Sequence, residues 1–458
     1  MQRRTFLTGA ALAAASSGLG ASARAAAIEA TTIGRDTPLD LRAAARAAFI
    51  YFLPLLELSR FHAADIRTPE AANVLTSHRT LRGPESRQVT TPNNDTLYTR
   101  GWLDLSRGPV DVVIPPTGDR YICVAFRDMF TNNFAVLGTR TTGGGGGVIR
   151  VVGPDAPLPP GALRSPHSMV WLSFRILVDG PQDLEAARKV QDAIVTRGPP
   201  GRVMEAHAGR DLEWEAYFAR AQQLIDLFPP PVTDLRFFRS IAALGVRPGG
   251  AFHAEQFTER DRRRISEGFA QGRRDVRDSH DSAGADGDSG VVIRDGWRYP
   301  ARKLGVFDQD YFLRADFALH GIGALPNEEA MYFDAVAPDG SLTFDSDRLF
   351  RLRFAPGRLP PVNAFWSLSM YEATPERQSF FTPNSLNRYS IGDRTPGLRR
   401  NSDGSLDIWI GRNDPGEARR ANWLPAPQRG PFTMMMRAYL PKPQLLNGLY
   451  MLPAIEAT

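Results

Sequence analysis

Residues 90–98 read Thr90-Thr91-Pro92-Asn93-Asn94-Asp95-Thr96-Leu97-Tyr98, and residues 99–105 continue as Thr99-Arg100-Gly101-Trp102-Leu103-Asp104-Leu105. The proline restrains its own φ and makes the residue before it extended, and the Asn-Asn-Asp run favours a turn because its side chains bond nearby backbone groups. The stretch therefore predicts a polar loop that leads into a β-strand. Loops held by rigid strands often carry binding and catalytic groups. The alternative is a turn that only starts the strand.

The length and composition are those of a globular protein with more than one domain. The chain has 458 residues, of which 42% are hydrophobic and 23% charged. This length suggests two or three domains and is ample for buried cores. The formal charge of +5 falls to +2 without residues 1–25, because that segment contains Arg3, Arg4, Arg24 and no acid. The remaining chain is not markedly basic, which argues against a nucleic-acid partner.

The N-terminal segment resembles an export signal. Two arginines precede Phe6-Leu7, a weakly apolar run follows from Thr8 to Gly20, and Ala23-Arg24-Ala25 forms a plausible cleavage site. This arrangement predicts a twin-arginine signal peptide over residues 1–25 and, as a partner, the twin-arginine export machinery. We therefore expect a periplasmic or secreted protein. No membrane span is expected after cleavage, since the run is shorter than the roughly 20 residues that a spanning helix needs.

The remaining chain divides into β, helical and β regions. A helix is expected over Leu39 to His62, kinked or broken at Pro54, and short strands with Pro and Gly turns follow to Val178. The glycines Gly143 to Gly147 lack the pattern of a phosphate-binding loop and are interpreted as a flexible hairpin. Further helices are expected in three segments, the last interrupted by Gly268 and Gly272; these segments are Leu212 to Phe228, Asp234 to Leu244 and Glu255 to Arg274.

The predicted fold class is mainly β with a helical insert, in the form of two jelly-roll-like β-sandwiches joined by an α-helical region. The predicted divisions are a β-sandwich with an N-terminal helix over 39–180, a helical region over 181–290 and a second sandwich over 291–458. A polar stretch, Asp275 to Gly290, is expected to form a mobile loop at the end of the helical region. The single cysteine, Cys123, stands in an apolar strand and is expected to be a core thiol.

Three polar clusters at strand ends supply the candidate site. If Asp95 and Asp128 converge, one could serve as a base while the other stays protonated. Tyr98 would assist them, and Arg388 could stabilise an anion. The candidates for substrate binding are Asn94, Asn132, Arg140, Asn387, Tyr389 and Trp366. The alternative is structural, with the Asn and Asp side chains satisfying turns and Arg388 pairing with Asp393.

Metal binding is an open alternative, and the cofactor is unknown. The seven histidines show no pair at metal-ligand spacing, so only His78 together with Asp95 and Asp128 forms a set for a divalent metal. The acids Asp281, Asp286 and Asp288 lack the spacing and closing Glu of a calcium loop. No Gly-x-Ser-x-Gly elbow supports a Ser-His-Asp triad.

The longer motifs resemble two domain families. Residues 91–98 and 102–105, with Gly118 to Tyr121, Asp128 to Thr131 and Gly138 to Thr142, resemble the DUF1254 domain. Pro361 to Tyr371, Asn387 to Arg394 and Asn422 to Pro427 resemble the DUF1214 domain that commonly follows it. The resemblance implies an exported bacterial protein of two sandwiches with helices between them. It implies no established mechanism.

Two functions follow as hypotheses. The first is a periplasmic hydrolase of a small oxygenated or ester-like compound, acting where the β domains meet. The second is a non-catalytic protein that binds a carbohydrate or lipid headgroup, and either could be a homo-oligomer. Because a sandwich fold serves both functions, the geometry of the carboxylates must discriminate between them.

Overall fold

The first sandwich stacks two sheets. In the computed structural model, which describes residues 38–87, 90–204, 210–282, 292–375 and 378–458, a five-stranded sheet has the order β1-β2-β8-β4-β5 and a four-stranded sheet the order β7-β6-β3-β9. Their strands are β1 Leu75–His78, β2 Thr96–Asp104, β8 Met169–Leu177, β4 Ile122–Arg127, β5 Asn133–Gly138, β7 Leu163–Arg164, β6 Gly147–Val152, β3 Val110–Ile114 and β9 Val195–Arg197. One apolar cluster fills the space between the sheets.

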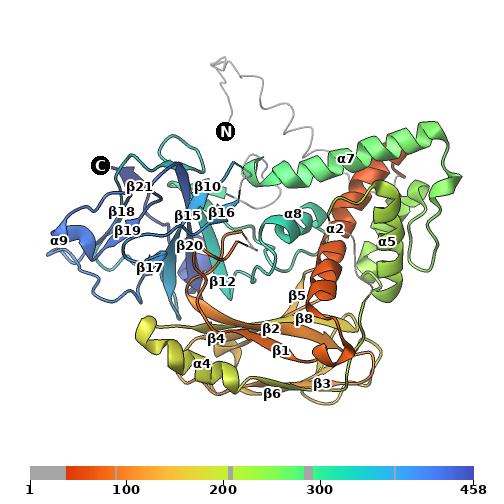
Figure 1. The fold of residues 1–458 in the computed structure, drawn as a ribbon, viewed down its shortest axis with the longest axis horizontal. Coiled ribbons are helices and arrows are strands. Elements are labelled where there is room, and N and C mark those ends of the chain that lie inside the picture. Colours follow the sequence, from red (N-terminus) through yellow and green to blue (C-terminus); the bar gives the residue numbers. More distant parts are fainter. Residues whose placement is uncertain (1–37, 88–89, 205–209, 283–291, 376–377) are drawn as a thin grey trace, which may run out of the picture.

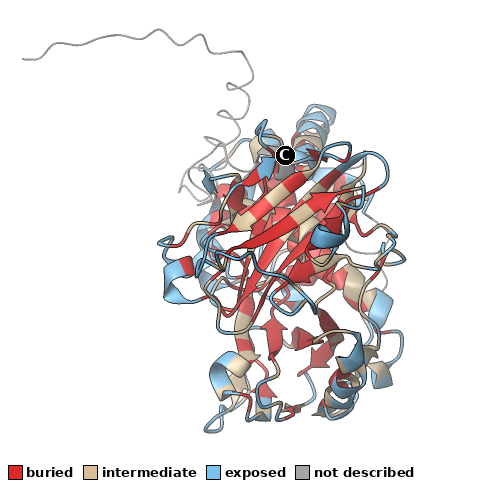
Figure 2. Cartoon of the chain, turned by 90° about the vertical axis from the view of Figure 1, so that its left-hand side faces the viewer, coloured by how far each residue is buried: buried red, intermediate tan, exposed pale blue. Residues whose placement is uncertain are grey.

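The second sandwich is built in the same way. Its larger sheet has the order β10-β11-β12-β20-β15-β16, with β13 paired to β20 and β17 to β15, and its smaller sheet the order β19-β18-β14-β21. The strands are β10 Val292–Arg294, β11 Trp297–Tyr299, β12 Ala330–Ala335, β20 Pro431–Tyr439, β15 Trp366–Ala373, β16 Ser379–Phe380, β13 Phe344–Asp345, β17 Ser390–Gly392, β19 Trp423–Pro425, β18 Leu406–Gly411, β14 Phe350–Phe354 and β21 Ile455–Ala457. Figure 2 shows buried segments along its strands.

The helices form a third region around α2. As Figure 1 shows, this helix lies among α5, α7 and α8. Most of its residues are buried. The helices are α2 Leu41–Asp65, α5 Trp214–Leu227, α6 Leu235–Ser240, α7 Glu259–Ser282 and α8 Tyr311–His320, with the shorter α3 Thr139–Thr142, α4 Leu184–Asp192, α9 Glu417–Arg420 and α10 Pro443–Leu446 and the 3-10 turns η1 Pro69–Ala71, η2 Pro181–Asp183, η3 Val232–Asp234, η4 Ala242–Leu244 and η5 Ala254–Gln256. The predicted fold class is thus confirmed.

Several local predictions differ from the structure. The helix α2 is continuous through Pro54, so the predicted break into two helices is absent, and neighbouring helices enclose it. The glycines Gly143 to Gly147 form no hairpin, since they connect β5 in one sheet to β6 in the other. The expected loop from Asp275 is helical as far as Ser282, at the end of α7, and the rest of it lies outside the described residues.

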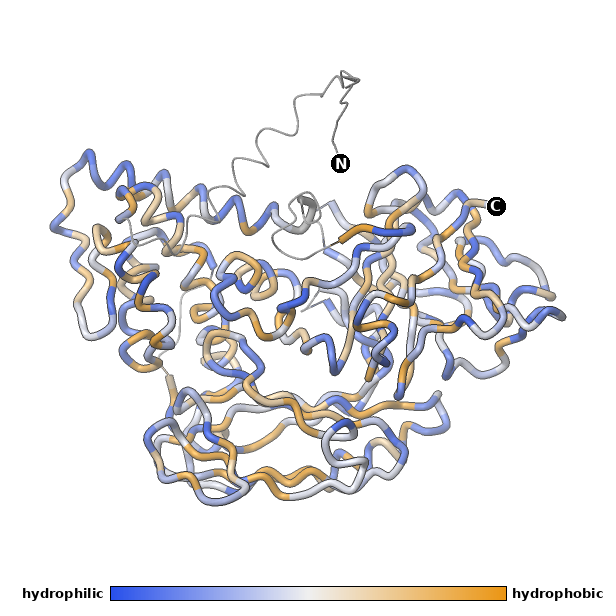
Figure 3. The backbone as a smooth tube through the Cα atoms, turned by 180° about the vertical axis from the view of Figure 1, so that it is seen from behind, coloured by the Kyte–Doolittle hydropathy of each residue, from blue (hydrophilic) through white to orange (hydrophobic). Residues whose placement is uncertain are grey.

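The predicted signal peptide also lies outside the described residues. Within the ranges that are described, no helix combines the length and the apolar character needed to cross a bilayer. The long helix α7 is predominantly hydrophilic, as the blue tube along the upper edge of Figure 3 shows.

The two sandwiches face each other through their larger sheets (Figure 1). An apolar cluster joins them, with Tyr121, Cys123 and Leu177 from the first sandwich packed against residues of the second that include Leu325, Phe365 and Tyr439. Sheet residues alternate between faces, so every second residue of β4, β8, β15 and β20 points away from its own sandwich core and toward this interface. The interface is therefore where polar side chains from both halves can meet.

Candidate functional site

Asp95 lies at the start of β2 and bonds to the second sandwich. Its carboxylate accepts hydrogen bonds from the Ser367 hydroxyl at 2.6 Å and the Ser390 hydroxyl at 3.2 Å. Burial raises the pKa of Asp95, and the nearby Arg437 guanidinium and the two hydroxyls oppose that shift. Asp95 of the first β domain therefore lies in direct contact with two hydroxyl groups of the second.

The loop before Asp95 is held in a defined conformation from both sides. The Asn93 side-chain oxygen accepts from the Asp95 backbone N–H at 2.6 Å, and the Asn93 amide donates to the Tyr439 hydroxyl at 2.6 Å. The Tyr371 hydroxyl donates to the Pro92 carbonyl at 2.8 Å. The Asx turn expected from the sequence is present, and residues of the other sandwich secure it.

Arg437 connects the same loop to β15. Its guanidinium donates to the Ser369 and Tyr371 hydroxyls, both at 2.8 Å, and to the Thr91 carbonyl at 2.9 Å. The side chain is buried, with 3% of the residue exposed. A buried cation thus lies beside Asp95 at the centre of the domain interface.

Two further arginines, Arg127 of β4 and Arg175 of β8, lie side by side on the first sandwich. Both donate to the Gly323 carbonyl at 2.8 Å, so their guanidinium groups converge on one oxygen. Arg127 also donates to the Ser173 hydroxyl at 2.8 Å, and its guanidinium stacks on the Trp171 ring. Burial foremost, with the neighbouring Arg175 charge, lowers the pKa of Arg127 to about 9.

Tyrosines surround Arg175. Its guanidinium lies 5.4 Å from the Tyr98 ring centroid and donates to the Tyr332 hydroxyl at 3.3 Å. Tyr98 and Tyr332 are both half-buried, as is Asp95, so solvent reaches this part of the interface. We call the whole group the interdomain polar layer; it comprises Asp95, Tyr98, Arg127, Ser173, Arg175, Tyr332, Ser367, Ser369, Tyr371, Ser390, Arg437 and Tyr439.

Arg140 forms a separate ion pair across the interface. Its Nε donates to Glu329 at 2.8 Å, and the other Glu329 oxygen accepts from the Tyr121 hydroxyl at 2.8 Å. Burial raises the pKa of Glu329, and the hydrogen bond from Arg140 opposes this shift. Arg140, predicted to bind substrate, instead pairs with a protein carboxylate.

Asp128 does not converge with Asp95. The Asp95 carbonyl accepts from the N–H of Val178, just after β8, whereas Arg127, the neighbour of Asp128, lies opposite Trp171 near the other end of β8. The positions of Val178 and Trp171 are seven residues apart, so the two acids are about 23 Å apart at roughly 3.3 Å per residue. Asp128 accepts from the Phe130 and Asn132 backbone N–H groups, both at 2.9 Å, and from the Asn132 side chain. Asp128 and Asn132 therefore complete a turn, as in the alternative interpretation in which Asn and Asp side chains have a structural role.

The third predicted cluster is also structural. Arg388 donates to the Arg420, Ala421 and Trp423 carbonyls and holds that loop in place, while its expected partner Asp393 accepts from the Trp366 backbone N–H. Asn387 adopts a positive φ of 47° and accepts from the Tyr389 hydroxyl at 3.4 Å. Arg388, Asn387 and Tyr389 therefore all lie outside the polar layer.

The remaining candidates lie elsewhere. Trp366 is 1% exposed and packs inside the second sandwich core, because alternation along β15 turns it away from the interface. The Asn94 amide donates to the Arg82 carbonyl. Among the described residues no group of three His, Cys, Asp or Glu side chains is arranged to hold a metal, so the proposed set of His78, Asp95 and Asp128 does not form.

The sequence interpretation missed most of the polar layer. The available signal was a single arginine inside a largely apolar strand, as in the β8 sequence Met169-Val170-Trp171-Leu172-Ser173-Phe174-Arg175-Ile176-Leu177 and at Arg437 in β20. Arginine is almost never fully buried unless it is paired. An isolated arginine in a buried strand therefore indicates a specific environment.

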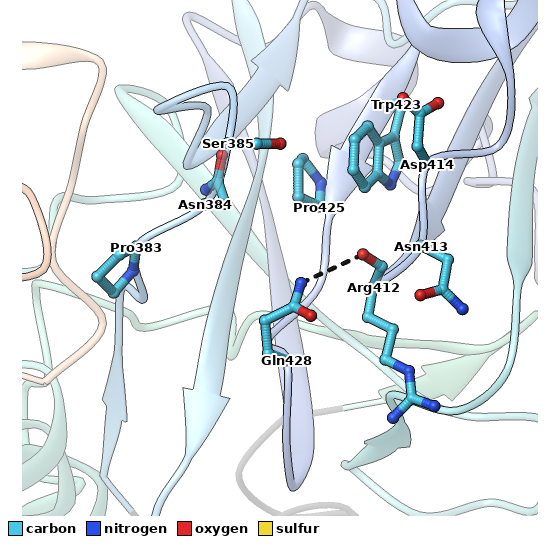
Figure 4. A pocket seen from close by; sticks show the side chains of 9 residues that line it. All are labelled: Pro383, Asn384, Ser385, Arg412, Asn413, Asp414, Trp423, Pro425 and Gln428. Carbon is cyan, nitrogen blue, oxygen red and sulfur yellow. Dashed lines mark hydrogen bonds between the residues drawn. The ribbon is translucent and has the colours of Figure 1, made fainter.

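A surface groove of about 510 Å³ lies apart from this layer, on the second sandwich, and is shown in Figure 4. Its floor includes the buried Trp423 and Pro425, and its rim includes Arg412 and Asp414. These two rim residues form ion pairs with Asp347 and Arg420. The groove contains no residue of the polar layer.

Two family models match separate parts of the chain. The family model described as a protein of unknown function (DUF1254) matches residues 72–197, and that described as a protein of unknown function (DUF1214) matches residues 329–443. No curated protein matches the chain.

Two solved structures are similar to the chain. One is the VPA0106 protein from Vibrio parahaemolyticus, with a TM-score of 0.67 and 23% identity over 91% of this chain and 100% of that one. The other is a putative uncharacterized protein from Burkholderia cenocepacia, with a TM-score of 0.43 and 14% identity over 96% and 97% of the two chains. The first likeness concerns the fold alone. The chain thus contains a DUF1254 domain followed by a DUF1214 domain, in the predicted order.

Proposed function

We propose that this chain is an exported protein that binds a small, oxygen-rich molecule between its two β domains. The observation that carries the proposal is the interdomain polar layer, in which donors and acceptors from both sandwiches meet around the half-buried Asp95, Tyr98 and Tyr332. Polar groups that converge in a partly enclosed interface between domains are typical of ligand sites. The proposal corresponds to the binding alternative considered from the sequence.

Thermal-shift screening of a small-molecule library tests the proposal. A ligand of this site should raise the melting temperature of the wild type and lose most of that effect in Asp95→Asn, which removes the charge at nearly constant shape. The control is Asp339→Asn, which removes an exposed carboxylate from a turn of the second sandwich. A ligand whose effect is equal in both variants does not bind at the polar layer.

Ester hydrolysis is a second candidate, and the contact between Ser390 and Asp95 supports it. A carboxylate within hydrogen-bond reach of a serine can accept its proton as the hydroxyl attacks an ester carbonyl, giving an acyl-serine and an alcohol; water then hydrolyses the acyl-serine. Ser390 is the more accessible partner because it is half-buried, whereas Ser367 is buried. Turnover of aryl esters that Ser390→Ala abolishes would favour this function, and undiminished turnover would remove it.

Export is a separate part of the proposal and rests on Arg3, Arg4 and the apolar run after them. Fusion of residues 1–37 to a reporter that functions only after folded export should give periplasmic signal. The Arg3→Lys/Arg4→Lys fusion should lose that signal. Equal export of both fusions would exclude the twin-arginine route.

A further inference from the structure

We infer that the ligand of the interdomain polar layer is an organic anion, and that Arg127 and Arg175 bind its carboxylate or phosphate group. This inference deepens the proposed function and rests on it. The shared chemistry is a planar or tetrahedral anionic group that accepts several hydrogen bonds, which guanidinium forks recognise well.

The first argument is charge. Arg127, Arg175 and Arg437 are each at most 7% exposed, and the polar layer contains a single carboxylate, Asp95, to offset them. Within the described ranges, neither Arg127 nor Arg175 has a carboxylate at ion-pair distance; their acceptors are a serine, a tyrosine and one backbone carbonyl. Burial of a charge without a counterion is unfavourable, so an anion bound here would supply what the fold lacks.

Other buried arginines of the chain show what is missing. Arg46 and Arg298, which are 7% and 6% exposed, pair with Asp275 at 2.5 Å and with Asp334 at 2.6 Å respectively. Arg127 and Arg175 are equally buried but face hydroxyls, aromatic rings and each other. Arg127 and Arg175 are thus two buried guanidinium groups that converge on one carbonyl oxygen without a carboxylate partner among the described residues.

The second argument is hydrogen bonding. The Nε–H groups of Arg127 and Arg175 are buried and have no acceptor among the described residues. One oxygen, the Gly323 carbonyl, accepts from the Nη2 atoms of both side chains. Two guanidinium groups thus converge with donors to spare, as expected where an oxyanion completes the set.

The third argument concerns the rest of the ligand. The arginine pair borders the apolar cluster that joins the sandwiches, which includes Cys123, Ala125 and Leu325. The phenols of Tyr98 and Tyr332 border it on the solvent-reached side. The apolar cluster is closed by protein packing, so the organic part of an anion held by the arginine pair would lie against the half-buried rings of Tyr98 and Tyr332.

The experiment compares four probes by thermal shift and calorimetry: benzoate, phenyl phosphate, and their uncharged counterparts benzamide and phenol. We expect at least one anion to stabilise the wild type and neither neutral compound to do so. Preference for benzoate or for phenyl phosphate distinguishes a carboxylate from a phosphate ligand. Arg175→Met, which removes the charge but keeps an extended side chain, should weaken binding of the anion at least tenfold.

Arg150→Gln is the matched control, because it removes one positive charge from an exposed arginine that pairs with Asp111 on the other sheet. It should bind the anion as the wild type does. If Arg175 has only a structural role, its replacement should lower the melting temperature of the ligand-free protein. If it is instead an unpaired buried charge, its replacement should leave the melting temperature unchanged or raise it. If Arg175→Met does not fold, a crystal of the wild type with 4-bromobenzoate should show the anomalous bromine signal beside the two arginines.

Four outcomes would overturn the inference. Equal binding of the anion by wild type and Arg175→Met would place it elsewhere, as would a bromine signal away from the pair. Stabilisation by benzamide or phenol that Asp95→Asn abolishes would retain the proposed function with a neutral ligand. Absence of stabilisation by all four probes would reject the organic anion while leaving the library screen to decide the proposed function.

Discussion

Individual side chains of the β4 and β8 strands show how burial controls chemistry. Cys123 lies directly opposite Arg175 in the strand register and has no exposed surface. Burial foremost, reinforced by Glu329, raises the pKa of the Cys123 thiol to about 12. The residue thus behaves as the core thiol that its apolar surroundings predict.

The thiol should therefore be unreactive in the native protein. Reaction requires the thiolate and access to it, and this site withholds both. We expect Ellman's reagent at pH 8 to label less than a tenth of the native protein within an hour and to label one thiol per chain in 6 M guanidinium chloride. Rapid stoichiometric labelling of the native protein would contradict the buried position of β4.

His62 should make stability depend on pH. It has no exposed surface, packs edge-on to Trp102, and burial lowers its pKa to about 4 from 6.5. Below pH 6.5 the unfolded chain binds a proton at this residue that the folded chain does not, so stability falls as pH falls toward 4. Between pH 7 and pH 5 this residue alone should remove about 2 kcal/mol of unfolding free energy.

Urea denaturation at pH 7 and pH 5 measures this dependence. His62→Phe keeps an aromatic ring beside Trp102, and its loss of stability at the lower pH should be about 2 kcal/mol smaller than that of the wild type. His253→Gln, an exposed control, should match the wild type. If the unfolding free energies of wild type and His62→Phe change equally between pH 7 and pH 5, His62 is accessible to protons in the folded state.

Residue type alone predicted part of the site. Asp95 and Tyr98, which lie in the polar layer, were among the predicted residues because the local Pro-Asn-Asn-Asp pattern predicts a turn. Arg388 and Trp366 were assigned wrongly because their roles depend on which face of a strand or loop they occupy. The arginine pair was missed because its meaning comes from the absence of an acid nearby, which only three-dimensional positions reveal.

At the scale of elements, glycine in α7 has a packing role. The sequence interpretation treated Gly268 and Gly272 as interruptions, yet α7 runs unbroken from Glu259 to Ser282 against α2. A Cβ atom at Gly268 would lie 2.0 Å from the Arg42 carbonyl oxygen of α2. The glycine therefore permits close approach of two helices, which single-sequence periodicity cannot show.

This contact reverses the usual effect of a helix substitution. An interior Gly→Ala change in an exposed helix is favourable by about 1 kcal/mol. Gly268→Ala should instead destabilise the protein by about 1–3 kcal/mol, because α2 must move away. Ser266→Ala, at an exposed position of the same helix, should change stability by less than about 0.5 kcal/mol. Equal effects of the two substitutions in urea denaturation would show that the helices are not in close contact.

At the scale of the whole molecule, the two β domains are joined by one continuous interface. The loop before Asp95 is held by Tyr371, Arg437 and Tyr439 of the other domain, and an apolar cluster lies beside it. The sequence predicted two sandwiches and their order, since strand patterns are local. It could not predict which faces meet, because alternation gives each strand two faces and only packing selects between them.

The Arg140 and Glu329 ion pair offers a direct test of this interface. The Glu329 carboxylate is 1% exposed and the Arg140 side chain 35% exposed. Removal of the cation in Arg140→Gln leaves a buried carboxylate without its counterion, which should cost about 2 kcal/mol, less than for a fully buried pair because solvent screens the arginine.

The Arg140→Gln substitution should weaken the interface between the two β domains, and a second substitution at Glu329 should restore part of the lost stability. In calorimetry, wild type should unfold in one transition, and Arg140→Gln should melt earlier, with the two β domains beginning to separate into two transitions. Adding Glu329→Gln removes the unpaired charge and should restore at least half of the lost stability, since Tyr121 can still donate to the amide oxygen. If the double variant is as unstable as the sum of both single variants, the two residues do not interact, and the domains are not held together at this point.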